Sequence, residues 1–262
     1  KIVLSGAVGG LIYQQRCISR TLADWLAARD HMSRAHLGAL KQLLRDKAGG
    51  RGQRNNLVKL VDVLDVLEVD QDALFPCPDS FPEVGAIVER EQFQNSIEEI
   101  KNTNKPILIH ASGGIGKTVF LQSLVNHYKK DHEVILFDCF GGGAYRAPED
   151  SRHLPKKAFV HIVNSLSRKG LCDPLIPSNA SIDDLLRTVR IRFEQAVDTL
   201  RRSSPDGRLM LFIDAADNSA EFALERKEEC FATELLKNAI YKCMPNVTII
   251  FSCRTERRSI VK

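Results

Sequence analysis

The sequence predicts an α/β fold, in which a parallel sheet is covered by helices, preceded by a small helical region. Short apolar runs of the kind that buried parallel strands show occur in four segments, 106–110, 133–140, 208–217 and 246–257. Helical patterns lie between these segments, and strands that alternate with helices form parallel sheets. We therefore expect at least four parallel strands within residues 93–262, in a core that is incomplete at its carboxyl end.

The composition is that of a globular protein without a membrane segment. Of the 262 residues, 44% are hydrophobic and 27% are charged, and no apolar run reaches the ~18 residues that a transmembrane helix needs. The seven cysteines show neither CxxC pairs nor histidines at metal-binding spacing, so neither a disulfide framework nor a zinc site is indicated. We expect a cytoplasmic protein that binds no membrane. Because the chain lacks an initial methionine and ends abruptly, we also expect it to be a piece of a longer protein.

Residues 1–74 are predicted to form a helical amino-terminal region. Apolar residues at helical spacing indicate three short helices, and the charges between Lys1 and Lys59 are predominantly basic. Such a region is either a solvated one whose charges pair locally or a helix-turn-helix reader of DNA. The proline-rich stretch LFPCPDSFP, at residues 74–82, prevents regular helix and marks a domain boundary. Residues 75–92 are then a linking segment ahead of the core.

A glycine-rich turn joins the first predicted strand to the helix that follows it. The stretch HASGGIGKT has the apolar run PILIH overlapping its start and a helical pattern after it. Glycines at such a turn let backbone N–H groups converge on an anion, and the helix start adds its partial positive charge. Lys117 supplies a positive charge for β- and γ-phosphates, and the hydroxyl of Thr118 is a ligand for Mg²⁺. The pattern is a P-loop with Ala111 in place of its first glycine, and we expect Gly114 and Gly116 to approach phosphate most closely.

An acidic residue suited to holding the metal ion ends a later strand. RLMLFIDAAD contains an apolar run that closes on Asp214, in the form of a Walker B strand. We expect Asp214 to hold Mg²⁺ together with Thr118, and Asp217 to orient or deprotonate the attacking water. The strand NVTIIFSCRTER ends in Ser252 and Arg254, which we expect near the γ-phosphate, where they would sense its presence. In the alternative interpretation, Arg254 only pairs with a neighbouring carboxylate.

These motifs, in this order and spacing, resemble the Walker A, Walker B and sensor 1 motifs of the STAND class of signal-transduction NTPases, the NACHT and NB-ARC type. The resemblance implies an ASCE or AAA-like core in which VEREQF, at residues 88–93, packs beside the adenine. The region from Phe137 to Pro177 is similar to the one after the second strand in large bacterial STAND ATPases, including antiviral defence proteins. The nucleotide-binding residues implied are Val88, Arg90, Ser112, Gly113, Gly114, Ile115, Gly116, Lys117, Thr118 and Val119.

The resemblance also implies a function. Proteins of this class are nucleotide-operated switches, closed with ADP and assembled into homo-oligomers with ATP, and a sensor region outside the NTPase core receives the trigger, such as a protein. Slow ATP hydrolysis is implied, because Ala215 and Ala216 stand where the class often has acidic residues. A fifth strand, lid helices and a winged helix would follow residue 262. ATP is favoured over GTP only because no NKxD-like guanine motif is visible.

Two other functions stay open. One is a DNA-handling P-loop ATPase whose basic amino-terminal helices bind duplex DNA, and the other is a scaffold that binds nucleotide without turnover. The long loop after the second strand adds a further expectation, because its polar side chains either reach a neighbouring subunit and its nucleotide or form an ordinary solvated loop. These side chains are Tyr145, Arg146, Arg152 and His153.

Overall fold

A computed structural model describes residues 24–27, 30–49, 58–81, 91–103, 105–147, 149–237 and 246–261. The chain divides into two compact units. One consists of Lys1–Leu74 with Pro174–Thr188, and the other of Phe75–Asp173 with Val189–Lys262. No helix among the described residues is long and apolar enough to cross a membrane.

The first unit is helical where it is described. It contains α2 (Asp30–Gly49), α3 (Leu60–Val66) and the 3₁₀ helix η1 (Gln71–Leu74). The carboxylate of Asp62 caps α3 by accepting the backbone N–H of Lys59 at 2.7 Å, in the manner expected of an acid in the first turn. A small apolar cluster stabilises the unit, and its buried members are Leu26, Val63, Leu67 and Ile176. The first of the three predicted helices lies largely outside the described residues.

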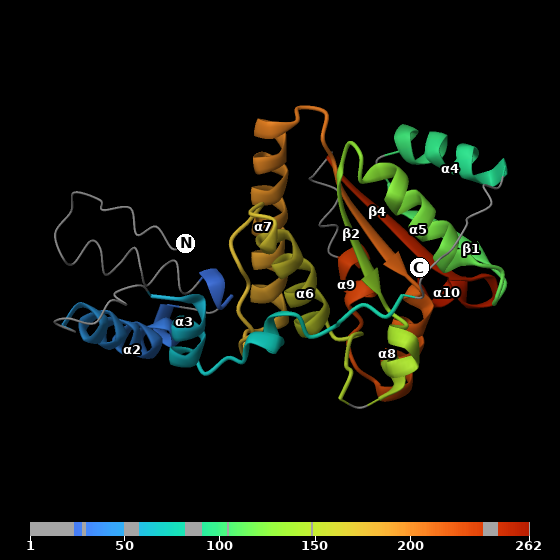
Figure 1. The fold of residues 1–262 in the computed structure, drawn as a ribbon. Coiled ribbons are helices and arrows are strands. Elements are labelled where there is room, and N and C mark those ends of the chain that lie inside the picture. The colour runs from blue at the N-terminus through green and yellow to red at the C-terminus, as the bar shows by residue number, and fades with distance from the viewer. Residues whose placement is uncertain are drawn as a thin grey trace. The chain divides into compact units, whose positions relative to one another are not determined.

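The second unit is built on a parallel sheet. Its strands are β1 (Ile107–Ala111), β2 (Glu133–Asp138), β3 (Leu209–Asp214) and β4 (Val247–Arg254). Among the described residues they pair in the order β1-β4-β3-β2, and every pairing is parallel. The strand that comes last in the chain therefore lies between the first and the third (Figure 1). This sheet confirms the predicted α/β class.

Helices α4 (Glu91–Asn102) and α5 (Lys117–Tyr128) cover one face of the sheet. Side chains two residues apart on a strand point to the same face, so alternate apolar residues of the strands meet these helices. The strand residues buried there are Val134, Met210, Phe212 and Ile250. From the helices, Phe93, Ile97, Leu121 and Leu124 complete this core.

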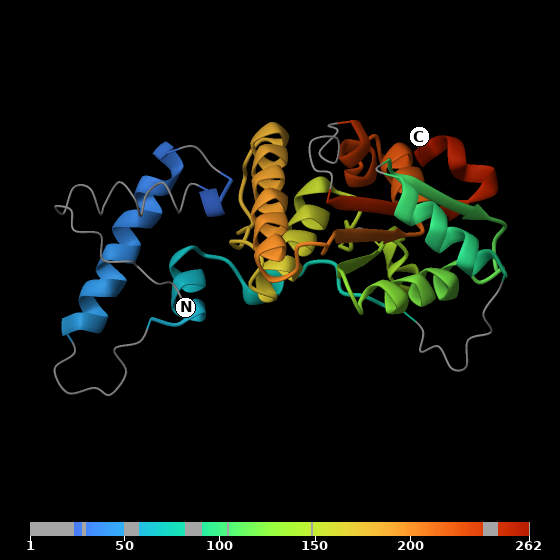
Figure 2. The same ribbon diagram turned by 90° about the horizontal axis from the view of Figure 1, so that it is seen from above.

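The opposite face is covered by α6 (Pro155–Arg168) and α9 (Phe231–Lys237). In β2, Val134 and Leu136 face α4 and α5, and Phe137 points to the opposite face. The centroid of the Phe137 ring lies 4.8 Å from that of the Phe231 ring. The ring of Phe159, on α6, lies 6.1 Å from the same Phe231 ring. Figures 1 and 2 show the sheet between its two layers of helices.

Among the described residues, five further elements complete the unit. They are η2 (Gly141–Arg146), α7 (Ile182–Ser203, which begins in the first unit), α8 (Ala216–Arg226), η4 (Thr255–Arg257) and α10 (Arg258–Val261). Of these, η2 follows β2, α8 follows β3, and η4 follows β4. Because parallel strands all end at the same edge, these three elements and the turn after β1 gather at the carboxyl edge of the sheet.

Candidate functional site

The glycine-rich turn lies between the end of β1 and the start of α5. Gly114 has a φ of 76° and Gly116 a φ of 91°, and residues with a β carbon rarely adopt such left-handed conformations. Glycine is therefore required at these two positions for the chain to enter α5 as it does. A β carbon built at Gly113 or Gly114 would meet no atom within 4 Å, so space is open around the turn. The first N–H groups of α5 have no partner within the helix and can bind an anion.

Lys117 begins α5, and its ammonium group lies against the turn. The Nζ atom donates to the carbonyl oxygen of Ala111 at 2.9 Å and to that of Ser112 at 2.8 Å. These two carbonyls belong to the end of β1 and the start of the turn. The positive charge is thus held within the loop whose N–H groups are available for an anion.

Thr118, in the first turn of α5, contacts Asp214, the last residue of β3. The hydroxyl of Thr118 donates to Oδ2 of Asp214 at 2.7 Å, and that of Ser252 donates to Oδ1 at 2.5 Å. The Ser252 hydroxyl also accepts the backbone N–H of Ala215 at 2.8 Å. The contact between Ser252 and Asp214 depends on the strand order, because β4 lies beside β3 and so places Ser252 next to the end of β3. The carboxylate of Asp214 is therefore oriented by one hydroxyl on each of its oxygens.

Burial dominates the electrostatics of Asp214. Only 2% of the residue is exposed, and burial raises the pKa of its carboxyl above the ordinary value of 3.8. The hydrogen bonds from Ser252 and Thr118 lower this pKa, and the nearby carboxylate of Asp138 raises it. A cation at this position would favour the ionised carboxylate, so the site is suited to a positive ion. Hydroxyl and carboxylate oxygens are also the ligand types that Mg²⁺ prefers.

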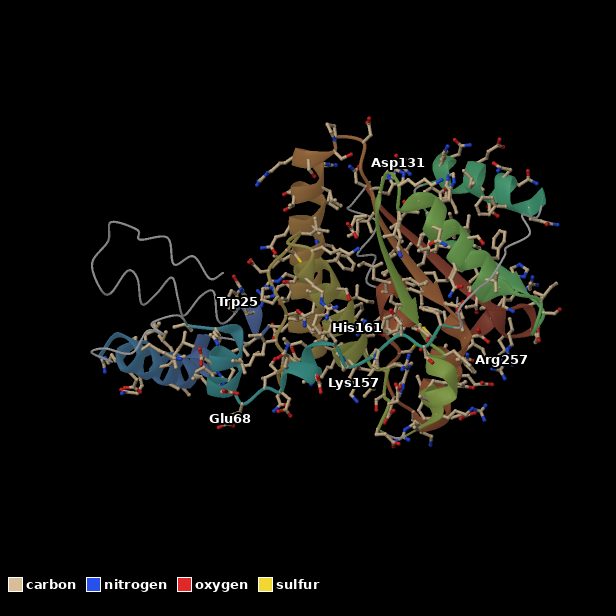
Figure 3. All side chains as sticks on the ribbon, in the orientation of Figure 1. Trp25, Glu68, Asp131, Lys157, His161 and Arg257 are labelled. Atoms are coloured by element: carbon tan, nitrogen blue, oxygen red, sulfur yellow. The ribbon has the colours of Figure 1, made fainter. Side chains whose placement is uncertain are left out.

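A second charged group lies at the same edge of the sheet. Asp217, on the first turn of α8, is 1% exposed, and its Oδ2 lies 3.9 Å from Nε of Arg254 and 3.7 Å from Nη1 of Arg257. Arg257 also pairs with Glu221, with 2.6 Å between Nη1 and Oε2. Figure 3 labels Arg257 near the end of β4. Asp217 and Arg254, both predicted site residues, are thus brought together as an ion pair.

The predicted site residues differ in where the structure places them. The loop residues, Thr118 and Asp214 lie close together, whereas Val88 and Arg90 lie outside the described residues. The hydroxyl of Ser252 is buried, donates to Asp214 and accepts the backbone N–H of Ala215, and the predicted sensing of a γ-phosphate by Ser252 stays a prediction. Its observed role is to orient Asp214. The predicted part of Asp217 in handling water stays a prediction.

Two alternatives are predicted for the side chains of the loop after β2, which are contact with a neighbouring subunit or exposure in an ordinary solvated loop. Arg152 is 2% exposed and donates to both carboxylate oxygens of Asp150, at 2.8 and 2.6 Å, and to the carbonyl oxygen of Asp138 at 2.7 Å. His153 is also buried, with Nε2 2.7 Å from Oε2 of Glu228. Both alternatives are therefore wrong for Arg152 and His153, because these side chains are buried and paired inside their own unit. Arg146 differs, since 61% of its side chain is exposed.

Two residues of the charged group, Glu221 and Arg257, were missed by the sequence reasoning. Glu221 stands one helical turn after Asp217, a spacing that places both carboxylates on one face of α8. That spacing was a usable signal for a shared partner. No local pattern identifies Arg257 as this partner, because the contact joins η4 to α8 across the fold.

Comparison with known proteins relates most of the second unit to one family. Residues 84–254, which are more than half of the chain, match the family described as nephrocystin 3, N-terminal. The matched range includes the glycine-rich turn and Asp214, and it ends at Arg254. A search of curated proteins finds no match to this chain.

Proposed function

The chain belongs to the nephrocystin 3 N-terminal family, and from this premise and the site geometry we propose that it is a nucleotide-binding module of the STAND class of P-loop NTPases. The observation that carries the proposal is the 2.7 Å contact between Thr118 Oγ1 and Asp214 Oδ2, beside a glycine turn that holds Lys117. A buried acid, a hydroxyl and an ammonium group at a helix start are the groups that a magnesium-bound polyphosphate requires.

Each group has a separate task in this proposal. The N–H groups of the turn and of the first residues of α5 bind phosphate oxygens, and Lys117 exchanges its carbonyl partners for the β- and γ-phosphates. Thr118 and Asp214 hold Mg²⁺, which neutralises phosphate charge when it is bound. The described residues contain no cluster of three or more His, Cys, Asp or Glu able to hold a metal on its own. In this proposal, phosphate oxygens and water supply the remaining ligands of Mg²⁺.

The proposed activity is a switch with slow ATP hydrolysis. A γ-phosphate adds contacts at the carboxyl edge that ADP cannot make, and such differential contact shifts a conformational equilibrium. A difference of about 5.5 kcal/mol would carry the population from almost wholly one state to almost wholly the other. Slow turnover is supported by Ala215 and Ala216, which stand where the class often has acidic residues. Oligomer assembly with ATP belongs to the proposal for the full-length protein.

Thermal unfolding with nucleotide, measured beside phosphate release, tests this function. At a concentration of about 100 times Kd, Mg-ADP or Mg-ATP should stabilise the protein by about 2.7 kcal/mol, which raises Tm by roughly 5 to 10 °C. Lys117→Ala should abolish the shift. Lys129→Ala is the matched control, since it removes an exposed lysine just after the other end of α5 and should retain the shift.

The outcomes separate the proposal from a binding scaffold. A shift with both nucleotides and phosphate release above that of Lys117→Ala supports a slow NTPase. A shift without any release above that variant would indicate nucleotide binding without turnover. No shift with ATP, ADP, GTP or GDP would overturn the proposal.

A further inference from the structure

The ion-pair group at the carboxyl edge joins three elements around one buried carboxylate. Asp217 faces Nε of Arg254 at 3.9 Å and Nη1 of Arg257 at 3.7 Å, and Arg257 is fixed on its other side by Glu221 at 2.6 Å. Oδ2 of Asp217 is buried and accepts no hydrogen bond from the described residues. Among the described residues, this oxygen forms ion pairs with the two arginines, and a buried carboxylate needs such partners.

Arg254 is placed where it can serve the glycine turn. Its α carbon is in register with Ala111 on the neighbouring strand, and the Ala111 carbonyl is one of the two that hold Lys117. Arg254 is thus anchored one strand away from the point where the turn begins. Its side chain is 40% exposed, so it is accessible from solvent at this edge.

The way in which Arg254 meets Asp217 leaves its outer donors available. The contact is made by Nε, the guanidinium nitrogen nearest the backbone, and the described residues offer its two terminal amino groups no ion pair of their own. A guanidinium group presents its donors in a rigid planar fork, so fixing one nitrogen fixes the direction of the others. The charge of the Asp217 carboxylate attracts Nε, which favours orientations in which the terminal amino groups point away from Asp217.

On the basis of the proposed function, we propose that Asp217 is a positioning residue that directs Arg254 toward the terminal phosphate and so makes the site prefer a nucleoside triphosphate over a diphosphate. Arg257 lies beside the same carboxylate, with Nη1 3.7 Å from Oδ2 of Asp217. A directed guanidinium group donates two hydrogen bonds to a γ-phosphate, whereas the β-phosphate of a diphosphate is already bound by the turn and Lys117. Asp217 acts through Arg254 and touches no reacting atom.

Calorimetry measures the preference for triphosphate over diphosphate directly. The preference is expressed as the ratio of Kd for Mg-ADP to Kd for the nonhydrolysable analogue Mg-AMPPNP. Asp217→Asn keeps the shape of the side chain but removes its charge, and it should lower this ratio about tenfold with the Kd for Mg-ADP unchanged. Glu221→Gln is the matched control, because it removes the same charge from the same helix and has no contact with Arg254. Its ratio should equal that of the wild type.

The control also separates direction from net charge. Both Asp217→Asn and Glu221→Gln remove one negative charge and make this edge of the sheet more positive. If net charge alone mattered, both variants would bind the more negative triphosphate more tightly, and the ratio of Kd for Mg-ADP to Kd for Mg-AMPPNP would rise. A fall confined to Asp217→Asn is expected only if the carboxylate directs Arg254. The ratio would contradict the proposal if it stayed constant or rose in Asp217→Asn, or if it fell equally in Glu221→Gln.

A second variant keeps the test decisive if Asp217→Asn does not fold. Arg254→Lys changes a partly exposed side chain and keeps its charge, but lysine has no Nε donor for Asp217 to hold and no fork. It should lower the ratio as far as Asp217→Asn does, and an unchanged ratio would overturn the proposal. If the wild type bound neither nucleotide, the proposed function would fail instead, so the two failures are distinguishable.

Discussion

Replacing Gly141 with alanine should strongly destabilise the second unit, because of one close approach. Gly141 has a φ of 56°, and a β carbon built there would lie 2.3 Å from Cζ of Arg152, a distance that requires movement. Arg152 cannot move freely. Its guanidinium group is 2% exposed and donates to Asp150 and to the carbonyl of Asp138. The new methyl group therefore forces a buried, fully paired arginine out of position.

The magnitude has two parts. The left-handed backbone conformation costs an alanine about 1 to 2 kcal/mol relative to glycine. Breaking a buried ion pair costs about 3 to 5 kcal/mol, and partial relaxation of Arg152 reduces this second part. We expect Gly141→Ala to lower the free energy of unfolding by at least about 3 kcal/mol. This loss is a large share of the stability of an ordinary domain.

Gly170→Ala isolates the backbone part. Gly170 has a φ of 75°, but a β carbon there meets no atom within 4 Å, so this variant should lose only about 1 to 2 kcal/mol. Urea unfolding followed by circular dichroism gives both values by linear extrapolation, provided that the m-values match the wild type. Equal losses in the two variants would refute the reasoning, since the contact with Arg152 would then carry no energy.

Two further predictions concern the core around the sheet. Burial is the main cause that lowers the pKa of His161 to about 4, and the nearby charge of Arg152 acts in the same direction. Between pH 6.5 and 4 the imidazole is therefore neutral in the folded state, whereas the unfolded chain takes up a proton there. The free energy of unfolding should therefore fall as pH drops from 6.5 to 4, by up to about 1.4 kcal/mol per pH unit, and His161→Gln should show a flatter dependence in urea unfolding at pH 7, 6 and 5. Phe231→Ala removes a fully buried ring that contacts Phe137 and should cost about 3 to 5 kcal/mol, whereas Leu224→Ala, at a residue 70% exposed, should stay within about 0.5 kcal/mol of wild type in the same assay.

The strands and the glycine turn could be predicted because their signals are local. Strands buried on both faces read as continuous apolar runs, and each predicted segment overlaps one of β1 to β4. Glycine is also the residue type that adopts a left-handed backbone most readily, as Gly114 and Gly116 do. The structure then adds what the turn holds, which is the ammonium group of Lys117.

The order of the strands could not be derived from the sequence. The insertion of β4 between β1 and β3 depends on how the crossover helices pack, and no residue of β4 indicates it. The role of Ser252 follows from that order, because its hydroxyl reaches Asp214 only if β4 and β3 are neighbours. The prediction placed Ser252 at the correct edge of the sheet but did not identify its contact with Asp214.

The burial of Arg152 and His153 could not be predicted from the neighbouring sequence either. Both lie in a polar segment after a glycine run, which is typical of an exposed loop. Arg152 pairs with the nearby Asp150 but also donates to the carbonyl oxygen of Asp138, and His153 pairs with the distant Glu228. Such contacts follow from tertiary packing, so the charge of a loop residue alone does not indicate whether it is exposed.

The account depends most on the joint action of Thr118 and Asp214 as holders of the metal ion of a bound nucleotide. Calorimetric titration of ADP into the wild type and into Thr118→Val, each with Mg²⁺ and with EDTA, tests this directly. Wild-type affinity should fall when Mg²⁺ is removed, while Thr118→Val, which lacks the hydroxyl but keeps the shape, should bind with the same reduced affinity in both conditions. An absence of heat with wild-type protein, or a magnesium dependence that survives in Thr118→Val, would contradict the central claim.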